Sequence, residues 1–290
     1  LYVWDMNTPT ADPTEMPLTD VVSGGTWLLS DVRVVDGKIF LSNMVMNPEQ
    51  VFKVYKWDGR DDPTPELILS YTVPASNIRL GDAISVIGNP PQNGYIFASN
   101  FAWPNNASEF YLWNFNNGQL SGPTVLPVTP TVALRMGQYG RVSAIPGEAD
   151  KLLVTGAEMG VAVMKYDGTF LYESSEPMIQ SRSYDFRVWD YNGGLYLSYV
   201  VNREWEGSTA ADKGIYYDII NITEGTGIVQ KLSNLNNNNI AQKRVFRHNF
   251  GAAAAVWVGA THQVGFGADG KPRAMSFGLN NGFIVHQFSN

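Results

Sequence analysis

Short hydrophobic segments recur along the whole chain, and each is bounded by a turn. In residues 109–114 (EFYLWN) successive side chains alternate in a way that is typical of a β-strand with one exposed face. Aromatic residues followed by Asp-Gly, as in 57–59 (WDG) and 166–168 (YDG), are typical of hairpins because Asp and Gly tolerate positive φ. No segment has convincing helical periodicity, so the pattern predicts an all-β fold.

A pair of strands recurs along the chain. In each copy a strand marked by Asp or Arg leads, within about fifteen residues, into an apolar strand that ends in a loop. The copies cover residues 31–43, 81–100, 140–156 and 185–199. Such a repeat predicts a β-propeller of four-stranded blades. The blade that is clearest in the sequence has an innermost strand at 82–88 and further strands at 95–100, 109–114 and 124–128.

The spacing of the predicted inner strands gives the number of blades. These strands begin near residues 31, 82, 139, 185 and 245. The interval from 245 through both termini back to 31 is long enough for two blades, so we expect a single propeller domain over 1–290 with six blades, five or seven being the alternatives. Residues 282–289 are expected as the second strand of the last blade and 1–5 as its third, so that both termini close it and remove exposed edges.

The composition argues against several classes of function. A net charge of −7 disfavours nucleic acid as a partner, because phosphates require a basic face. The chain has no cysteine, which removes thiol catalysis and thiolate metal sites, and no apolar run has the length of a membrane span. It begins at Leu1 inside a strand-like segment, which indicates a fragment whose targeting segment has been removed.

Three loops before predicted inner strands contain a related phrase: 79–82 (RLGD), 135–138 (RMGQ) and 182–185 (RSYD). In a propeller these loops surround the central channel, so the phrase predicts a charged ring at the channel mouth. The residues of this ring are Arg79, Arg135, Arg182, Asp82 and Asp185. The alternative is that each Arg pairs with an Asp of a neighbouring blade and joins the blades together.

The loops between second and third strands place Trp among polar residues, as in 101–108 (FAWPNNAS) and 201–208 (VNREWEGS). A Trp ring packs on the C–H groups of a sugar while amides and carboxylates bind its hydroxyls. The residues of this candidate sugar platform are Trp103, Asn105, Asn106, Arg203, Glu204 and Trp205. The alternative is that Trp103 and Trp205 fold back onto their own blades. The Trp residues at strand positions are expected in the core; these are Trp4, Trp57, Trp113, Trp189 and Trp257.

Histidines and a carboxylate-rich turn give weaker signals. His248, His262 and His286 match no zinc motif and are expected in core or surface roles, although His248 lies beside a predicted inner strand. The turn 58–62 (DGRDD) lacks the spacing of a calcium loop and is expected to be solvated. We therefore expect no metal and no cofactor.

A glycosidase would need two carboxylates across a cleft, and the acids that begin inner strands are candidates if they converge on the axis. These are Asp31, Asp82 and Asp185, with Glu204 and Glu206 beside Trp205 as further acids. The repetition of the inner-strand acids argues against catalysis, because catalytic residues differ between blades. We assign no catalytic residue.

The phrases 54–59 (VYKWDG) and 94–100 (GYIFASN) carry a resemblance to a known group of proteins. The chain resembles the propeller domains of unknown function in secreted or lipid-anchored Bacteroidetes proteins, which are often associated with glycan use. The resemblance would cover most of the chain and implies an extracytoplasmic location: secreted, periplasmic or anchored by lipid to the outer membrane. Similar proteins carry a lipoprotein signal and a small β-sandwich domain before the propeller. No catalytic residue carries over, and the Asp box of sialidases is absent.

The sequence thus predicts an extracytoplasmic module that binds a glycan, most simply an acidic saccharide if the arginines face solvent. A hydrolase or lyase that uses axial carboxylates is one alternative. A protein-interaction scaffold, with a broad apolar face in place of a pocket, is another.

Overall fold

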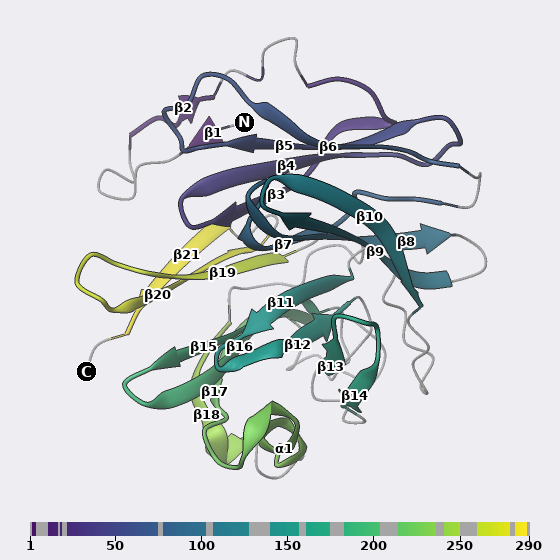
Figure 1. The fold of residues 1–290 in the computed structure, drawn as a ribbon. Coiled ribbons are helices and arrows are strands. Elements are labelled where there is room, and N and C mark those ends of the chain that lie inside the picture. Colours follow the sequence, from purple (N-terminus) through teal and green to yellow (C-terminus); the bar gives the residue numbers. More distant parts are fainter. Residues whose placement is uncertain are drawn as a thin grey trace. The chain divides into compact units, whose positions relative to one another are not determined.

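The computed structural model describes residues 2–3, 11–16, 18, 22–74, 78–102, 107–127, 140–156, 161–174, 183–203, 214–235, 241–249, 260–278 and 282–288. These residues form antiparallel sheets and a short α-helix (Figure 1). The chain divides into two compact units, Leu1–Leu126 and Pro127–Asn290. That both units form one domain stays a prediction.

The first unit contains two four-stranded sheets in which the strands pair in the order of the sequence. The strands of the first sheet are β3 (Trp27–Val35), β4 (Lys38–Met44), β5 (Val51–Trp57) and β6 (Glu66–Thr72). The strands of the second sheet are β7 (Ile84–Asn89), β8 (Asn93–Ala102), β9 (Ala107–Asn116) and β10 (Gln119–Pro127). A separate two-stranded sheet pairs β1 (Tyr2–Val3) with β2 (Thr14–Glu15).

The second unit contains two more four-stranded sheets and one three-stranded sheet, again with strands paired in the order of the sequence. The first sheet has β11 (Arg141–Ile145), β12 (Glu148–Thr155), β13 (Ala162–Lys165) and β14 (Phe170–Glu173). The next sheet has β15 (Ser183–Tyr191), β16 (Gly194–Arg203), β17 (Gly214–Asn221) and β18 (Arg244–Asn249). The last sheet has β19 (Ala260–Phe266), β20 (Pro272–Gly278) and β21 (Gly282–Gln287).

A short helix was not expected from the sequence. Helix α1 (Gly227–Ser233) lies between β17 and β18 and buries Ile228 and Leu232 in the core of its unit. Its first turn is held by Glu148, whose carboxylate accepts the backbone N–H of Ile228 at 2.9 Å. Seven residues are too few for a helical period to stand out from the surrounding strands.

The chain is an all-β protein built from the four-stranded antiparallel blades of a β-propeller, as predicted, but five blade sheets are described, not six. The prediction of six blades was wrong because residues 244–249 were interpreted as an inner strand. They form β18, the outer strand of the β15–β18 sheet, where Ile219 of β17 pairs with Phe246. The long interval around the termini therefore contains one blade sheet, which begins at β19.

The predicted strand order at the termini also differs from the described pairings. β21 pairs with β20 and is the third strand of its sheet. Residues 282–289 had been predicted as the second strand of the last blade. β1 pairs with β2 in the described residues. Closure of the last blade by both termini is thus not among the pairings that the structure describes.

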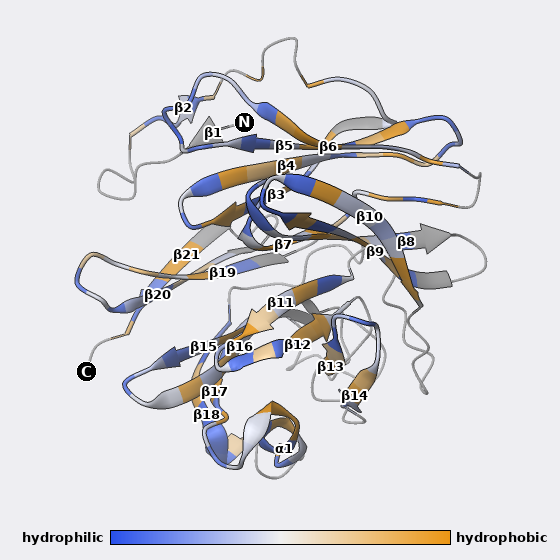
Figure 2. Ribbon diagram, viewed as in Figure 1, coloured by the Kyte–Doolittle hydropathy of each residue, from blue (hydrophilic) through white to orange (hydrophobic). Residues whose placement is uncertain are grey.

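Aromatic and aliphatic side chains fill the space on both faces of the middle strands. In β4 the hydrophobic residues 39–41 follow the hydrophilic Lys38, and all three are buried (Figure 2). Trp57, Trp113 and Trp189 are at most 4% exposed, which confirms their predicted place in the core. Trp113 stacks on Phe52 of the neighbouring sheet at a centroid distance of 5.5 Å. The other predicted core tryptophans, Trp4 and Trp257, lie outside the described residues.

Candidate functional site

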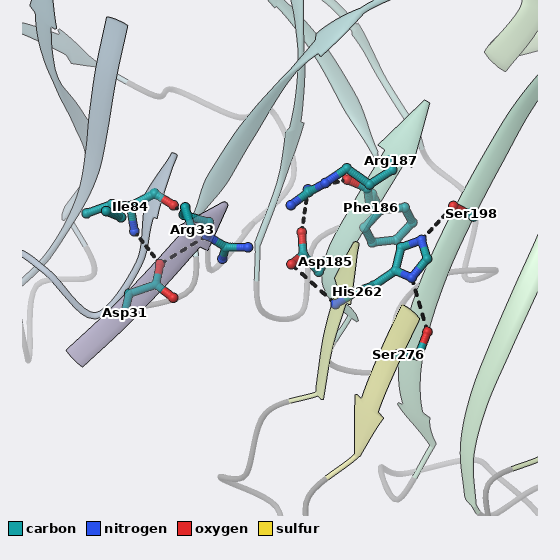
Figure 3. A network of polar contacts seen from close by, with 9 residues as sticks. All are labelled: Asp31, Arg33, Ile84, Asp185, Phe186, Arg187, Ser198, His262 and Ser276. Atoms are coloured by element: carbon teal, nitrogen blue, oxygen red, sulfur yellow. Dashed lines mark hydrogen bonds and ion pairs between the residues drawn. The ribbon is translucent and has the colours of Figure 1, made fainter. Parts of the chain in front are cut away.

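In the first unit, an acid and an arginine of β3 hold the first strand of the next sheet (Figure 3). Asp31 Oδ2 accepts the backbone N–H of Ile84 at 2.8 Å. Arg33 Nε donates to the carbonyl of Ile84 at 3.1 Å and to Asp31 at 3.3 Å. Asp31 and Arg33 are 8% and 6% exposed, so both charges are paired inside the protein. The pair therefore joins two blades by satisfying both backbone polar groups of one residue.

A second acid–arginine pair closes the loop that precedes β7. Arg79 donates from Nε to Asp82 Oδ2 at 2.6 Å and from Nη2 to Oδ1 at 2.5 Å, which is a bidentate contact. The Arg79 side chain is 25% exposed and that of Asp82 is 11% exposed. Burial raises the pKa of the Asp82 carboxyl above its ordinary value; Arg79 opposes this shift, and the charge of Asp31 adds to it.

Backbone contacts fix the position of this loop at the end of the sheet. Leu80 pairs with Val45 through two backbone hydrogen bonds of 2.9 and 3.1 Å. Gly81 has φ of +100°, and a Cβ atom there would lie 1.9 Å from the carbonyl oxygen of Asn43. The glycine of the phrase 79–82 is thus required by a close approach of two backbones.

Two asparagines at the ends of second strands organise the loops around them. Asn100 Oδ1 accepts the backbone N–H of Arg79 at 2.9 Å, and its amide donates to Glu109 at 3.2 Å. Asn43 accepts the N–H of Lys53 and donates to the carbonyl of Val51. The sequence analysis did not single out these residues, although the Ser-Asn phrase that ends both strands, at 42–43 and 99–100, is a visible signal.

In the second unit, Asp185 repeats the arrangement of Asp31 (Figure 3). Asp185 is fully buried, and its Oδ1 accepts a hydrogen bond from Arg187 Nη1 at 2.5 Å. Its Oδ2 accepts the backbone N–H of His262 on β19 at 3.4 Å. In both units an Asp-x-Arg phrase on one inner strand therefore binds the backbone of the inner strand of another sheet. These contacts join blades through backbone groups. The predicted pairing of Arg135 and Arg182 with acids of neighbouring blades stays a prediction.

The His262 ring is held between two serines. Its Nε2 lies 2.6 Å from Ser198 Oγ and its Nδ1 lies 3.1 Å from Ser276 Oγ, while Trp189 Nε1 donates to Ser198 at 3.0 Å (Figure 3 shows the ring and both hydroxyls). Burial lowers the pKa of His262 to about 3; Asp185 opposes this shift and Arg187 adds to it, so the ring is neutral at neutral pH.

This Ser–His–Ser arrangement is closed to a substrate. His262 and Ser276 are each 1% exposed and Ser198 is fully buried. A nucleophile and its base must reach a reacting atom, and these groups cannot, so we assign the network to packing between β15, β16, β19 and β20. All three histidines were expected in core or surface roles, and His262 has a core role. His248, which was noted beside a predicted inner strand, is on the outer strand β18.

The carboxylate-rich turn is capped by its own chain. Asp62 accepts the backbone N–H groups of Asp58 at 2.9 Å and Thr64 at 3.1 Å, and these two bonds lower its pKa. Asp58 pairs with Lys56 at 2.8 Å, and the Asp61 side chain is 90% exposed. Among the residues that the structure describes, no group of three or more His, Asp or Glu side chains is arranged to hold a metal ion.

The structure describes part of the predicted site. Arg79, Asp82 and Asp185 lie at the starts of inner strands, as predicted, and Arg79 pairs with Asp82 of its own loop. Of Arg203 only the backbone is described, paired with Gly214. The other predicted site residues lie outside the described residues: Trp103, Asn105, Asn106, Arg135, Arg182, Glu204 and Trp205.

A family model described as a domain of unknown function, DUF4623, matches residues 4–281. The chain belongs to the DUF4623 family. This confirms the resemblance to propeller domains of unknown function. A search of curated proteins found no match.

Solved structures share the fold. A DUF4623 protein from Bacteroides eggerthii superposes with a TM-score of 0.76 at 20% identity, over 96% of this chain and 61% of that one. The chain thus spans about three fifths of the length of that relative. The arabinanase of Bacillus subtilis has a TM-score of 0.50 at 13% identity, over 92% and 96% of the two chains. A GH43 endo-arabinanase from Bacillus licheniformis has the same TM-score at 12% identity, over 89% and 92%. At these identities the likeness establishes the fold.

Proposed function

We propose that this DUF4623 chain is an extracytoplasmic carbohydrate-binding module, with the platform on the loops between second and third strands. The observation that carries the proposal is the topology of the β7–β10 sheet. Ile84, the first residue of β7, pairs with Ala98 near the end of β8, so β8 ends at the same end of the sheet where β7 begins. Residues 103–106 connect β8 to β9 in the sequence. The Arg79–Asp82 pair is at this same end of the sheet. The backbone N–H of Arg79 donates to Asn100, which precedes Trp103 by three residues in the sequence.

The neighbouring groups suit a sugar. The Arg79–Asp82 pair places partly exposed polar groups at this end of the sheet, and Asn105 and Asn106 add amides that can bind hydroxyl groups. Because the Arg79 charge is matched by Asp82, this end of the blade suits a neutral saccharide better than an acidic one. The loop with Arg203, Glu204 and Trp205 connects β16 to β17 in the same position within its own sheet.

The fold relatives support a glycan as ligand. Two of them are named as arabinanases, so their fold accommodates work on a polysaccharide. We also propose the location outside the cytoplasm from this ligand class and from the Bacteroides relative. The helical residues that the structure describes include no segment with the length and hydrophobicity of a transmembrane helix. Binding of this kind requires no cofactor.

A hydrolase is the second candidate, and one observation favours it. Asp82 is buried, its pKa is raised, and the charge of Asp31 contributes to that shift, which is how an enzyme prepares a general acid. Against this, both oxygens of Asp82 are bound by Arg79, and Asp31 is committed to Ile84. Catalysis would require these contacts to break, whereas binding does not.

A turnover assay separates the two candidates. The protein is incubated with arabinan and with other plant and host polysaccharides, and retention in affinity electrophoresis is compared with release of reducing ends. The binding module predicts retention without release, both in the wild-type protein and in Asp82→Asn. Release of reducing ends that is abolished in Asp82→Asn, with the variant still folded, would replace the proposal by the hydrolase.

A further inference from the structure

A second candidate ligand site lies in the β15–β18 sheet, where β17 ends and β18 begins. It is an open cavity of about 410 Å³, lined by Asn221, Thr223, Glu224, Gln242, Lys243 and Arg244. Its volume falls in the range of small-molecule sites and accommodates a sugar residue. Neither the predicted platform nor the Arg79–Asp82 pair includes any of these residues.

The cavity contains an arginine whose charge is only partly balanced. Asp218 is fully buried, and its Oδ1 lies 3.2 Å from Arg244 Nε and 3.5 Å from Arg247 Nε. Its other oxygen accepts the hydroxyl of Tyr199 at 3.0 Å. Two guanidinium groups therefore share one carboxylate, and a positive charge remains. Arg244 lines the cavity, its side chain is 20% exposed, and the ion pair that the structure describes for it is formed by Nε.

A second cation lines the same cavity. Lys243 Nζ pairs with Glu224 Oε2 at 2.7 Å, and this contact lowers the pKa of Glu224. The Glu224 side chain is 78% exposed, so the pair is a surface contact that a ligand carboxylate can displace at little cost. In a chain of net charge −7, two adjacent cations on a cavity wall favour an anionic ligand.

The remaining groups of the wall suit hydroxyls. Asn221 accepts the backbone N–H of Thr223 with its Oδ1, which directs its amide NH₂ group to other partners. Gln242 is exposed and offers a second amide. A guanidinium binds carboxylates and phosphates alike, and the two amides favour a carboxylate that is carried by a hydroxyl-rich sugar ring.

We propose that this cavity binds a uronic acid residue, with its carboxylate on Arg244 and Lys243 and its hydroxyls on Asn221 and Gln242. The choice of a sugar acid rests on the proposed glycan function, whereas the anion site rests on the cavity alone. The cavity lies at the C-terminal end of strand β17, whose eight residues rise by roughly 23 Å, whereas residues 204–213 precede its first residue in the chain. The two sites can therefore be tested independently.

The test is isothermal titration of the whole chain with trigalacturonate, with neutral galactotriose as the matched sugar, and with phosphate and sulfate. Trigalacturonate is expected to bind, and Arg244→Gln is expected to weaken it by about tenfold or more through loss of charged hydrogen bonds. Glu224→Gln should bind more tightly, because Lys243 loses its competing partner. Arg273→Gln is the matched control, since Arg273 pairs with Asp269 in the same unit and lies outside the cavity.

Arg244→Gln is expected to fold, because Asp218 keeps Arg247 and Tyr199 as partners. If it does not fold, Lys243→Gln tests the same site, since the ion pair that the structure describes for Lys243 is the exposed contact with Glu224. Absence of trigalacturonate binding in the wild-type protein, or binding by Arg244→Gln and Lys243→Gln that is as tight as that of the wild-type protein, would overturn the proposal. Binding of phosphate or sulfate as tight as that of trigalacturonate would overturn the assignment to a sugar acid. Trigalacturonate binding that persists in Trp103→Ala and Trp205→Ala supports the cavity even if the platform fails.

Discussion

The buried His262 ring predicts a specific dependence of stability on pH. In the folded protein its pKa is lowered from 6.5 to about 3 by burial, while in the unfolded chain the ring has its ordinary pKa. A pKa that is lower in the folded state means that the unfolded state binds the proton first. The stabilisation from the neutral ring is therefore complete above about pH 6.5 and is lost as the pH falls toward 3.

The size of the effect follows from the same two values. Each pH unit below the unfolded-state pKa costs about 1.4 kcal/mol, so the contribution of His262 falls by about 3 kcal/mol between pH 7 and pH 4. The group is 1% exposed, so solvent screening reduces this figure little. Burial also lowers the pKa of His286, and carboxylates titrate in the same pH range. The pH dependence of the wild-type unfolding free energy alone therefore does not isolate the contribution of His262.

The assay is urea denaturation of the wild-type protein and His262→Gln at several pH values. Taking the difference in unfolding free energy between the two proteins cancels His286 and the carboxylates. We expect this difference to be constant above pH 7 and to shrink by about 3 kcal/mol by pH 4. A difference that does not change with pH, or that grows as the pH falls, would refute the assignment of a neutral ring between Ser198 and Ser276.

Two further predictions concern the first unit. Asp31→Ala removes the carboxylate that pairs with the buried Arg33 guanidinium and the acceptor of the Ile84 backbone N–H, and is expected to cost about 3–5 kcal/mol of unfolding free energy in urea denaturation. Asp61→Asn, on an exposed side chain, should change the unfolding free energy by less than about 0.5 kcal/mol, and equal effects would contradict the role of Asp31. Gly81→Ala places a Cβ against the Asn43 carbonyl and should lower the unfolding free energy by about 2 kcal/mol or more. The control is Gly37→Ala, at a position with positive φ and open space, which should lower it by about 1 kcal/mol in the same assay. Equal losses in the two variants would contradict the close approach of the two backbones at Gly81.

Local pattern was sufficient to predict most strands of the fold. The second blade sheet was predicted strand by strand, because alternation and Asn-Gly or Asp-Gly turns mark each hairpin. The blade count failed at β18, since an outer strand and an inner strand have the same length and alternation, and only pairing distinguishes them. The same error drew attention to His248 and away from His262, whose burial depends on residues of three other strands.

The partners of the charged residues could not be predicted either, because they lie on another sheet. The repeated Asp-x-Arg phrase of 31–33 and 185–187 was visible, but its partners are backbone groups of another sheet, which no side-chain pattern records. The cavity between β17 and β18 was not predicted, because Asn221, Glu224 and Arg244 become neighbours only when β18 pairs with β17.

A glycan array that also reports turnover tests the binding-module proposal. The wild-type protein, the double variant Trp103→Ala/Trp205→Ala and the control Phe266→Ala, which removes an exposed aromatic of β19, are applied to the same array. Bound glycans are then examined by mass spectrometry. We predict that the wild-type protein and Phe266→Ala retain a common set of neutral glycans in intact form and that the folded double variant loses them. Cleaved glycans, retention that is equal in all three proteins, or no retention by the wild-type protein would contradict the proposal.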